Sequence, residues 1–404
     1  MSVYLDYNAT TPVDAEVQET ICSAIKNVWG NPSSSYDLGK KAKNIVENAR
    51  EKVAKMVGSL PSEILFTSGG TESNNMVIST AIQYYHTKVQ NVTNGLKEEK
   101  PHIITSNIEH DSVKLPLEKL SDEGKADVTF VPVSKITGAV EIDDIINSIR
   151  PNTCLITLML ANNETGVIQP VSSLRSKLKS IKDNKFQRGH SLNSILLHTD
   201  AAQAIGKIEV DVEDLDVDYL TVVGHKFYGP RIGALYFKNG APLFPIFYGG
   251  GQERNYRPGT ENTCMIAGLG KAAELVSSNL KEYNKHMTAM NHHLKMCLET
   301  TFPEHCVFHI KDNSNKLPNT VSVALDYEKV SGAALLSEAK QICASTGAAC
   351  HSGGKPSSIL ISSGISCELA SKTLRLSVGR ETTEKEIETA VAYLDTAVKS
   401  FVIK

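Results

Sequence analysis

Residues 219–226 read YLTVVGHK, a short apolar run of strand-forming residues that ends in a glycine, a histidine and a lysine. Runs of this kind alternate with longer helical patterns from residue 62 to about residue 240. Such alternation is typical of a mostly parallel β-sheet with helices on both faces. We therefore predict a sheet of seven strands: Glu63–Phe66, His102–Thr105, Val128–Val131, Cys154–Leu160, Ile195–His198, Tyr219–Val223 and Ile232–Phe237.

The pattern changes after the glycine run 249–251. Long helical stretches follow, then a short strand near 320–325 and a last amphipathic helix from residue 384. A chain of 404 residues exceeds the roughly 250–300 residues at which a single core stops growing. We predict a large α/β domain and a smaller α+β domain, with the boundaries 17–263 for the first and 1–16 plus 264–404 for the second.

The composition excludes several classes of protein. The chain is 41% hydrophobic and 22% charged with a formal net charge of −3, which argues against disorder and against nucleic-acid binding. No apolar run approaches the ~18–20 residues of a membrane span, and the first residues show no basic or hydrophobic leader. The eight cysteines are scattered without a CxxC pair, which favours reduced thiols. We expect a cytosolic protein that binds neither membrane nor metal.

Polar residues follow the predicted strands, and ligands bind beyond the carboxyl ends of strands in open α/β sheets. The first strand leads into a Gly-Gly turn and a helix, where backbone N–H groups and the helix dipole can hold a phosphate. At the end of 219–223 stands Lys226, which can be desolvated, have its pKa lowered and form a Schiff base with an aldehyde. The strand ends read 67–73 (TSGGTES), 109–111 (EHD), 162–166 (NNETG), 199–203 (TDAAQ) and 224–226 (GHK).

Each feature also has a plain structural interpretation when it is taken alone. The Gly-Gly turn could be a simple connection, Lys226 a solvated loop residue, Asp200 a helix cap and His110 a core histidine. The combination favours pyridoxal 5'-phosphate (PLP), which requires a lysine for its aldehyde, an acid against its ring nitrogen and a phosphate cradle. The sequence therefore predicts a PLP site with Lys226, Asp200 and His110, the histidine serving the ring face or proton transfer.

The same residues lie in motifs that resemble the class V, NifS-like family of PLP-dependent aminotransferases, which includes cysteine desulfurases and selenocysteine lyases. The resemblance spans nearly the whole chain and implies the type I fold of PLP-dependent transferases. It is carried by 5–12 (LDYNATTP), 30–34 (GNPSS), 67–74 (TSGGTESN), 109–110, 162–166, 200–203, 224–226, 257–260 (RPGT) and 347–350 (GAAC). Similarity to the selenocysteine lyase branch is carried by 110–111 (HD), 161–166 (ANNETG), 227–231 (FYGPR) and 257–262 (RPGTEN).

The resemblance implies a role for each candidate residue. Thr260 would reach the cofactor phosphate of a partner subunit, which implies a homodimer. Asn163, also near the cofactor, and Arg375 would bind the substrate carboxylate, a task suited to the paired donors of a guanidinium. Many bacterial desulfurases have a serine where this chain has Val223, so one phosphate contact of those enzymes is not expected here. The remaining cofactor contacts would come from Lys226 (Schiff base), Asp200 (ring nitrogen), Gln203 (ring hydroxyl), His110 (stacked on the ring), and Gly70, Thr71 and His225 (phosphate).

The resemblance also implies a reaction, the decomposition of L-selenocysteine to L-alanine and selenide with a reduced acceptor. Cys350 would act on the leaving atom as a nucleophile or as a proton donor, and its run of small residues suits a thiol that approaches and withdraws. Selenium and sulfur differ little in size, so discrimination would depend on ionisation. We expect Asp111, next to His110, to contact the substrate, to tune the local charge and to keep Cys350 protonated against thiol substrates.

Two alternatives stay open at this stage. A cysteine desulfurase would share the same residues and would pass a persulfide from Cys350 to an acceptor protein. A scaffold or binding protein without catalysis would have no need of Lys226, Asp200 and Cys350, and all three are present.

Overall fold

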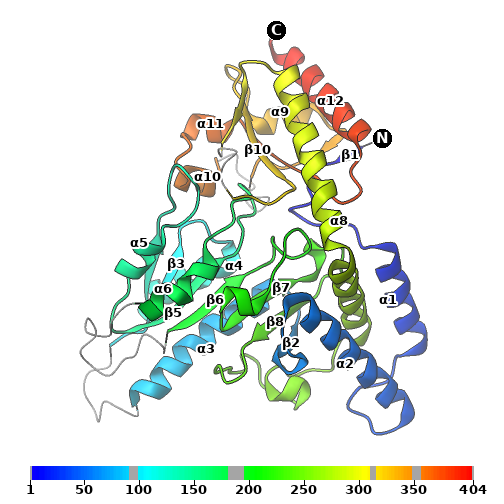
Figure 1. Cartoon of the computed structure of the whole chain (residues 1–404), viewed down its shortest axis with the longest axis vertical. Coiled ribbons are helices and arrows are strands. Elements are labelled where there is room, and N and C mark those ends of the chain that lie inside the picture. The colour runs from blue at the N-terminus through cyan, green and yellow to red at the C-terminus, as the bar shows by residue number, and fades with distance from the viewer. Residues whose placement is uncertain (1, 91–98, 181–194, 310–314, 348–355, 403–404) are drawn as a thin grey trace.

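The large sheet is the frame of the molecule. The computed structural model describes residues 2–90, 99–180, 195–309, 315–347 and 356–402. Within them, seven strands form one sheet in the order β2-β8-β7-β6-β5-β3-β4 (Figure 1). Strand β8 runs antiparallel to its neighbours β2 and β7, and the other pairings are parallel, which confirms the predicted sheet. The strands are β2 (Ile64–Thr67), β3 (His102–Ser106), β4 (Asp127–Val131), β5 (Thr153–Met159), β6 (Leu196–Asp200), β7 (Tyr219–Val223) and β8 (Gly233–Phe237).

The strands read as continuous apolar runs because both faces of the sheet are covered. Successive side chains of a strand point to opposite faces, so Leu220 and Val222 join one apolar cluster and Tyr219 joins another. One face carries α3 (Gly70–Gln90) and α4 (Asp111–Asp122). The other face carries α1 (Ala15–Asn27), α2 (Asp37–Val57), α5 (Ile142–Asn147), α6 (Leu174–Ser180), α7 (Val212–Leu215) and the first half of α8 (Thr263–Thr301).

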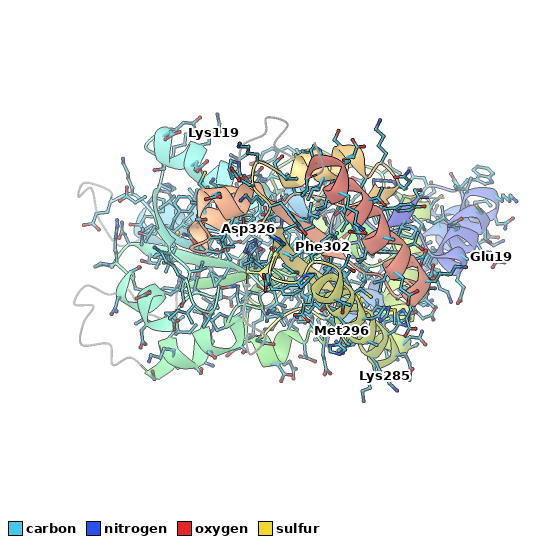
Figure 2. The ribbon with its side chains drawn as sticks, turned by 90° about the horizontal axis from the view of Figure 1, so that it is seen from above. Glu19, Lys119, Lys285, Met296, Phe302 and Asp326 are labelled. Atoms are coloured by element: carbon cyan, nitrogen blue, oxygen red, sulfur yellow. The ribbon has the colours of Figure 1, made fainter. Side chains whose placement is uncertain are left out.

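A second apolar core lies at the end of the molecule where the two chain ends are found (Figure 1). It lies between a three-stranded antiparallel sheet, a short parallel pair and the second half of α8. In the view from above in Figure 2, Phe302 and Asp326 of this part lie near the centre, with Glu19 of α1 toward one side and Lys119 of α4 toward the other. Its elements are β1 (Val3–Tyr4), β9 (Cys306–Phe308), β10 (Thr320–Leu325), β11 (Ile342–Cys343), β12 (Thr373–Ser377), α9 (Gly332–Glu338) and α12 (Glu384–Val402). Two short helices, α10 (Ser358–Ser362) and α11 (Cys367–Ser371), lie between β11 and β12 in the chain, and Ile359 of α10 packs in the large core.

Helix α8 connects the two cores. Its first half places Ile266 and Ala273 in the large core, and its second half places Leu294 and Leu298 in the small one. The predicted domain boundary lies at the start of this helix, and the division of the chain stays a prediction. The sequence shows its clearest helical pattern over 265–292, and the helix extends beyond this pattern at both ends, to Thr263 and Thr301. None of the described helices is both long and apolar enough to cross a membrane.

One expectation about the surface is wrong in part. The sequence predicts surface insertions at 87–100 and 180–194, because both stretches are polar and lack apolar periodicity. Residues 87–90 instead form the last turn of α3. Residues 91–98, and 181–194 of a second expected insertion, lie outside the described residues. A polar helix end lacks apolar periodicity for the same reason that a loop does, because it faces water.

A buried ion pair fixes the segment between β8 and α8. Both guanidinium Nη atoms of Arg50 donate to Glu253, at 2.9 and 2.6 Å, and the Phe66 backbone N–H donates to the same carboxylate at 2.8 Å. Arg50 is 5% exposed and Glu253 is 8% exposed. Glu253 and Arg254 have positive φ angles of 46° and 58°, which residues other than glycine rarely adopt. The ion pair holds this unusual backbone in place.

We predict that Glu253→Gln lowers the free energy of unfolding by about 3 kcal/mol, because the buried Arg50 charge loses its buried counterion and keeps only the exposed Glu47. Urea unfolding of the cofactor-free protein measures this loss. The matched control is Glu274→Gln, which breaks partly exposed ion pairs with Lys52 and Lys271 and should cost less than about 1 kcal/mol. Equal losses in the two variants would contradict the prediction.

Candidate active site

A cavity of about 270 Å³ opens beyond the carboxyl ends of β3, β5, β6 and β7. It gathers residues that lie far apart in the sequence, because the parallel strands all deliver their ends to the same edge. Among the described residues, no group of three or more histidine, cysteine, aspartate or glutamate side chains is arranged to hold a metal ion. The predicted site residues that line the cavity are Gly70, Thr71, His110, Asp111, Asn163, Asp200, Gln203, His225, Lys226 and Arg375.

Lys226 lies directly after β7 and is half-buried in the cavity wall. Its Nζ donates to the backbone oxygens of Asn8 and Ala9, at 2.7 and 2.8 Å. The chain makes a tight turn around the lysine, so that Gly224 before it and Pro230 after it lie close together. A Cβ at Gly224 would lie 2.5 Å from the Pro230 oxygen. The turn therefore requires glycine and presents the lysine amine at a defined point.

Asp200 is the last residue of β6 and is 7% exposed. One carboxylate oxygen accepts from the Ala202 backbone N–H at 3.0 Å, and the other accepts from Asn74 Nδ2 at 2.8 Å. These neutral donors leave a buried carboxylate at the cavity with no ion-pair partner among the described residues. A cationic N–H in the cavity, such as that of a protonated pyridine ring, would be stabilised by it.

A chain of hydrogen bonds connects Asp200 to His110. Asn74 Nδ2 also donates to Ser112 Oγ at 2.8 Å, and Ser112 Oγ lies 2.8 Å from His110 Nδ1. The Ser112 backbone N–H donates to the same Nδ1 at 3.1 Å, because His110 caps the N-terminus of α4. Nδ1 is thus an acceptor, and the proton of the neutral ring lies on Nε2.

The N-terminus of α3 forms one wall of the cavity, where Gly70 and Thr71 leave backbone N–H groups for an anion. A Cβ at Gly70 would lie 2.7 Å from Val223 Cγ2, so only glycine fits beside this valine. His225 Nδ1 lies 3.0 Å from the Thr10 hydroxyl. Burial, together with nearby Lys226, lowers the pKa of His225 to about 4, so the ring is neutral at physiological pH.

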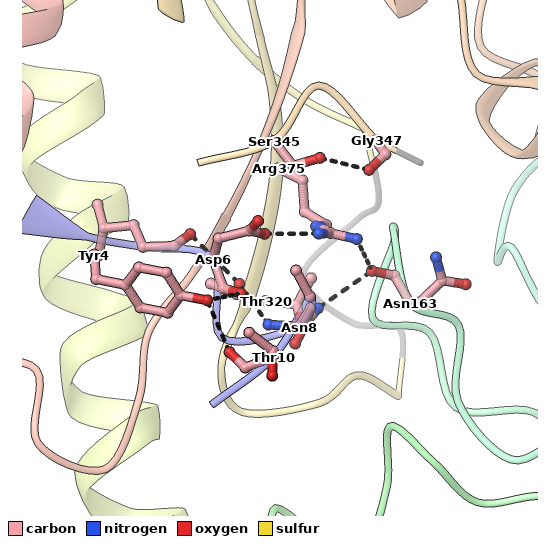
Figure 3. A network of polar contacts seen from close by, with 12 residues as sticks. Tyr4, Asp6, Asn8, Thr10, Asn163, Thr320, Ser345, Gly347 and Arg375 are labelled. Carbon is pink, nitrogen blue, oxygen red and sulfur yellow. Dashed lines mark hydrogen bonds and ion pairs between the residues drawn. The ribbon is translucent and has the colours of Figure 1, made fainter. Parts of the chain in front are cut away.

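Arg375 also lines the cavity and lies on β12, in the part of the molecule around the second core, here called the small unit (Figure 3). Its Nη2 donates to Asp6 at 2.7 Å and its Nη1 donates to the Asn163 backbone oxygen at 3.0 Å. Burial outweighs the arginine and raises the pKa of Asp6 above its ordinary value. Arg375 Nε and Asn163 Oδ1 are buried without hydrogen-bond partners in the described structure. Buried polar atoms are normally satisfied, so this pair points to a bound ligand.

These features fit PLP. The α3 N-terminus suits a phosphate, Lys226 suits an aldehyde, Asp200 suits a ring nitrogen, and the unsatisfied Arg375 and Asn163 atoms suit an amino-acid substrate. Val223 also lines the cavity, and its side chain offers an apolar surface and no hydrogen bond. This agrees with the missing phosphate contact that the sequence predicts at this position.

Two predicted site residues are not placed in the cavity. Thr260 is exposed and does not line the cavity of its own chain. Cys350 lies outside the described residues. On either side of its segment, a Cβ at Gly347 would lie 2.8 Å from Glu164 Oε2, and the Ser357 hydroxyl donates to that oxygen at 2.5 Å. Ser358 and Ile359 then line the cavity.

Several residues of the site have no role in the sequence-based hypothesis. Asn8 and Asn74 lie inside quoted motifs, so the motifs contained a signal for them. Ser112 and Lys207 have no such signal, because their contacts depend on how α4 and the turn after Gln203 are placed.

Glu109, the residue before His110, is a further member of the cavity wall. It is 3% exposed, and its carboxyl group accepts from the Ser106 hydroxyl at 2.5 Å and from the Met159 backbone N–H at 3.1 Å. Burial raises the pKa of Glu109 to about 8, with a smaller contribution from the negative charge of Asp200. Glu109 is therefore protonated at neutral pH.

The fold and the cavity define a lysine-dependent PLP enzyme. The sequence profile of the aminotransferase class-V family matches residues 3–389, and the chain belongs to this family. Enzymes of the family use PLP.

The chain is similar to curated relatives over almost its whole length. It is 51% identical to selenocysteine lyase of Xenopus laevis, covering 98% of this chain and 94% of the relative. It is 50% identical to selenocysteine lyase of Homo sapiens, covering 98% and 92%. Cysteine desulfurase IscS of Clostridium botulinum is 39% identical, covering 98% and 94%.

Solved structures share the fold. A NifS-like protein superposes with a TM-score of 0.86 at 33% identity, covering 99% of this chain and 100% of that one. SspA in complex with cysteine superposes with a TM-score of 0.75 at 31% identity, covering 95% and 100%.

The buried Glu109 carboxyl predicts a pH dependence of stability. Its pKa is about 8 in the folded protein against 4.5 ordinarily, so its stabilising contribution is complete below about pH 4.5 and is lost as the pH rises to 8. Between pH 5 and 8, the wild type should lose about 1.4 kcal/mol per pH unit relative to Glu109→Gln, which cannot ionise. Urea unfolding of both cofactor-free proteins across this range measures the difference, and parallel profiles would refute the assignment.

Proposed function

We propose that this protein is a PLP-dependent selenocysteine lyase, which converts L-selenocysteine and a reduced acceptor to L-alanine and selenide. The observation that carries the proposal is the cavity that joins Lys226 and Asp200 on one side to Arg375 and Asn163 on the other. The two selenocysteine lyases, similar at 50–51% identity over 98% of the chain, support the substrate.

When it is bound, PLP supplies an aldehyde that condenses with amines and a protonated ring that stores the electron pair released at Cα. Asp200 would hold the ring nitrogen in its protonated form, and Asn74 holds the Asp200 carboxylate in place. Gln203 would donate to the ring hydroxyl. The α3 N-terminus with Gly70 and Thr71 would hold the phosphate, together with His225.

Arg375 and Asn163 would hold the substrate carboxylate, and Arg375 Nε, which has no partner in the described structure, would donate to it. Asn163 Oδ1 also has no partner there and can only accept, so it would face an N–H of the substrate. Lys226 Nζ takes the proton from the substrate Cα and later delivers a proton to Cβ of alanine. The Cβ–Se bond breaks between these two steps. The reduced acceptor supplies the two electrons that make the products alanine and selenide. His110, whose Nδ1 is held as an acceptor, would present its Nε2–H and its ring face to the cofactor.

Cys350 would serve the leaving selenium, either by bonding to it as a nucleophile or by giving it a proton. The residues that flank its segment support this role, because Ser358 lines the cavity and Ser357 is bonded to Glu164 beside Asn163. The division into a large domain of 17–263 and a small domain of 1–16 and 264–404 would then place Cys350 in the small domain.

We further propose that the chain works as a homodimer in the cytosol, since class-V enzymes are typically dimeric. Thr260 is exposed and outside its own cavity, as expected if it reaches the cofactor of a partner subunit. Large apolar side chains are also exposed in the described structure, among them Tyr248 at 86% and Trp29 at 70%. Surfaces of this kind mark interfaces when they gather into a patch.

A second candidate function is cysteine desulfurase, with a persulfide left on Cys350 for transfer to an acceptor protein. The 39% identity to IscS over 98% of the chain favours this candidate, because the same site residues would serve both reactions. It ranks second because the lyases are more similar to this chain.

The test is alanine formation by the PLP-loaded protein from L-selenocysteine and L-cysteine at equal concentration. We expect alanine chiefly from selenocysteine, and a loss of at least about a thousandfold in Lys226→Ala, which lacks the proton carrier. Lys238→Ala, at the exposed end of β8, is the control and should keep full activity. Equal turnover of the two substrates with persulfide on Cys350 would establish the desulfurase instead, and no turnover of either would reject both.

Asp111 lines the cavity at the first turn of α4, and we propose that its charge discriminates the substrates. The selenol of selenocysteine is already anionic at neutral pH. The negative charge of Asp111 would keep the Cys350 thiol protonated, and therefore unreactive toward thiol substrates. Asp111→Lys should lower the selenocysteine-to-cysteine ratio of turnover on the order of tenfold. Asp122→Lys, the same change at the exposed far end of α4, should leave the ratio unchanged. An unchanged ratio in Asp111→Lys would remove this role.

A further inference from the structure

Lys207 is a buried lysine for which the proposed mechanism has no role. It is 4% exposed and lies one turn after Gln203. The chain bends at Gly206, whose φ is +79° and where a Cβ would lie 2.7 Å from Phe227 Cβ. Asn284 of α8 donates to the Lys207 backbone oxygen at 2.8 Å. This backbone geometry fixes the lysine behind the cavity wall.

The Lys207 ammonium group is held by amide oxygens. Its Nζ lies 2.8 Å from Gln203 Oε1 and 3.2 Å from Asn8 Oδ1, and it has no ion-pair partner among the described residues. A buried ammonium without a carboxylate is costly, so a purely structural role would be an unusual use of lysine.

The contact with Lys207 sets the orientation of the Gln203 side chain. An ammonium group only donates, so the atom of Gln203 that faces it must be the amide oxygen. The Gln203 amide nitrogen therefore turns to the other side, where it donates to the Asn8 backbone oxygen at 3.0 Å, and Gln203 is one of the residues that line the cavity. With Lys207 removed, the amide could rotate and present its oxygen to the cavity.

Lys207 also brings a second positive charge to Lys226. Both amines bind Asn8, Lys226 on the backbone oxygen and Lys207 on the side-chain oxygen. Burial first, and then the charges of Lys226 and Arg375, lower the pKa of Lys207 well below its ordinary value. Two protonated amines this close would repel each other, so the doubly charged state is disfavoured. The other titratable groups that face the two amines or share the cavity are Asp6, Glu109, His110, Asp111, Lys114, Asp200 and His225.

We propose that Lys207 is a positioning residue of this site, which orients the Gln203 amide toward the cofactor and, when it is itself protonated, favours the neutral, nucleophilic amine of Lys226. A lysine beside another cation is a known way to activate an amine toward a carbonyl group. The proposal rests on the proposed function, because it requires the aldehyde cofactor.

The experiment compares wild type, Lys207→Met and Lys207→Arg in the capture of PLP by the cofactor-free protein, followed by visible absorbance from pH 6 to 9. In Lys207→Met, capture at neutral pH should be several-fold slower, and the difference should vanish at high pH, where the Lys226 amine is neutral in both proteins. The pH midpoint of the bound cofactor's absorbance should rise on the order of one pH unit. Lys207→Arg keeps the charge and should restore the wild-type midpoint.

The matched control is Lys372→Met, which removes a lysine that is 7% exposed but ion-paired to Asp326 and Glu368 in the small unit. It should change thermal stability and leave the midpoint unchanged. If Lys207→Met fails to fold, as judged by thermal unfolding, Lys207→Gln takes its place. If Lys207→Met, or Lys207→Gln in its place, shows the same pH midpoint as the wild type, the role of Lys207 is overturned and the proposed function is not. If the wild-type protein captures no PLP, the proposed function is overturned as well.

Discussion

The hydrogen bonds of Asn8 are the interaction on which the site depends. This residue is 1% exposed and lies in the N-terminal segment, between the two apolar cores. Its backbone oxygen accepts from the reactive lysine and its side chain binds the small unit, so one residue fixes the distance between the two walls of the cavity. Because it is buried, every one of these bonds that is lost would leave an unsatisfied polar group. The partners of Asn8 are Gln203, Lys207, Lys226, Asn163, Asn319, Thr320 and Ser377.

The cavity concentrates charges that do not neutralise one another within the described chain. Asp200 has only neutral donors, Lys207 has only amide oxygens, and Glu109 avoids the conflict by staying protonated. The two charged arrangements, those of Asp200 and Lys207, are unfavourable for folding, because burial penalises the charged form of a group. The unfavourable groups gather where a charged cofactor and an amino-acid substrate would complete them, which is the usual sign of a functional site. Stability elsewhere comes from the paired charges, such as Arg50 with Glu253, and from the apolar cores.

Much of the fold could be predicted, and so could the composition of the cavity. The strand at 219–223 is found within its predicted bounds, as is the strand at 320–325, because runs of buried apolar residues leave a clear period in the sequence. The last turn of α3 was not predictable, since a polar helix end and a loop look alike. For the cavity, strand ends were enough to bring together Lys226, Asp200 and Asn163. They could not indicate Lys207, whose position depends on a glycine turn and on a helix nearly eighty residues further along.

The sequence by itself determined which chemistry is available. The lysine, the acid, the phosphate turn and the family motifs each lie in a short stretch of the chain and can be recognised there. Only the tertiary structure decided which atoms face one another. It oriented the Gln203 amide through Lys207, set the His110 tautomer through Ser112, and left Arg375 Nε without a partner among the described residues. The physical reason is that periodicity and motifs record burial and backbone conformation along the chain. Hydrogen bonds between residues hundreds of positions apart depend on the packing of two cores, which no local pattern contains.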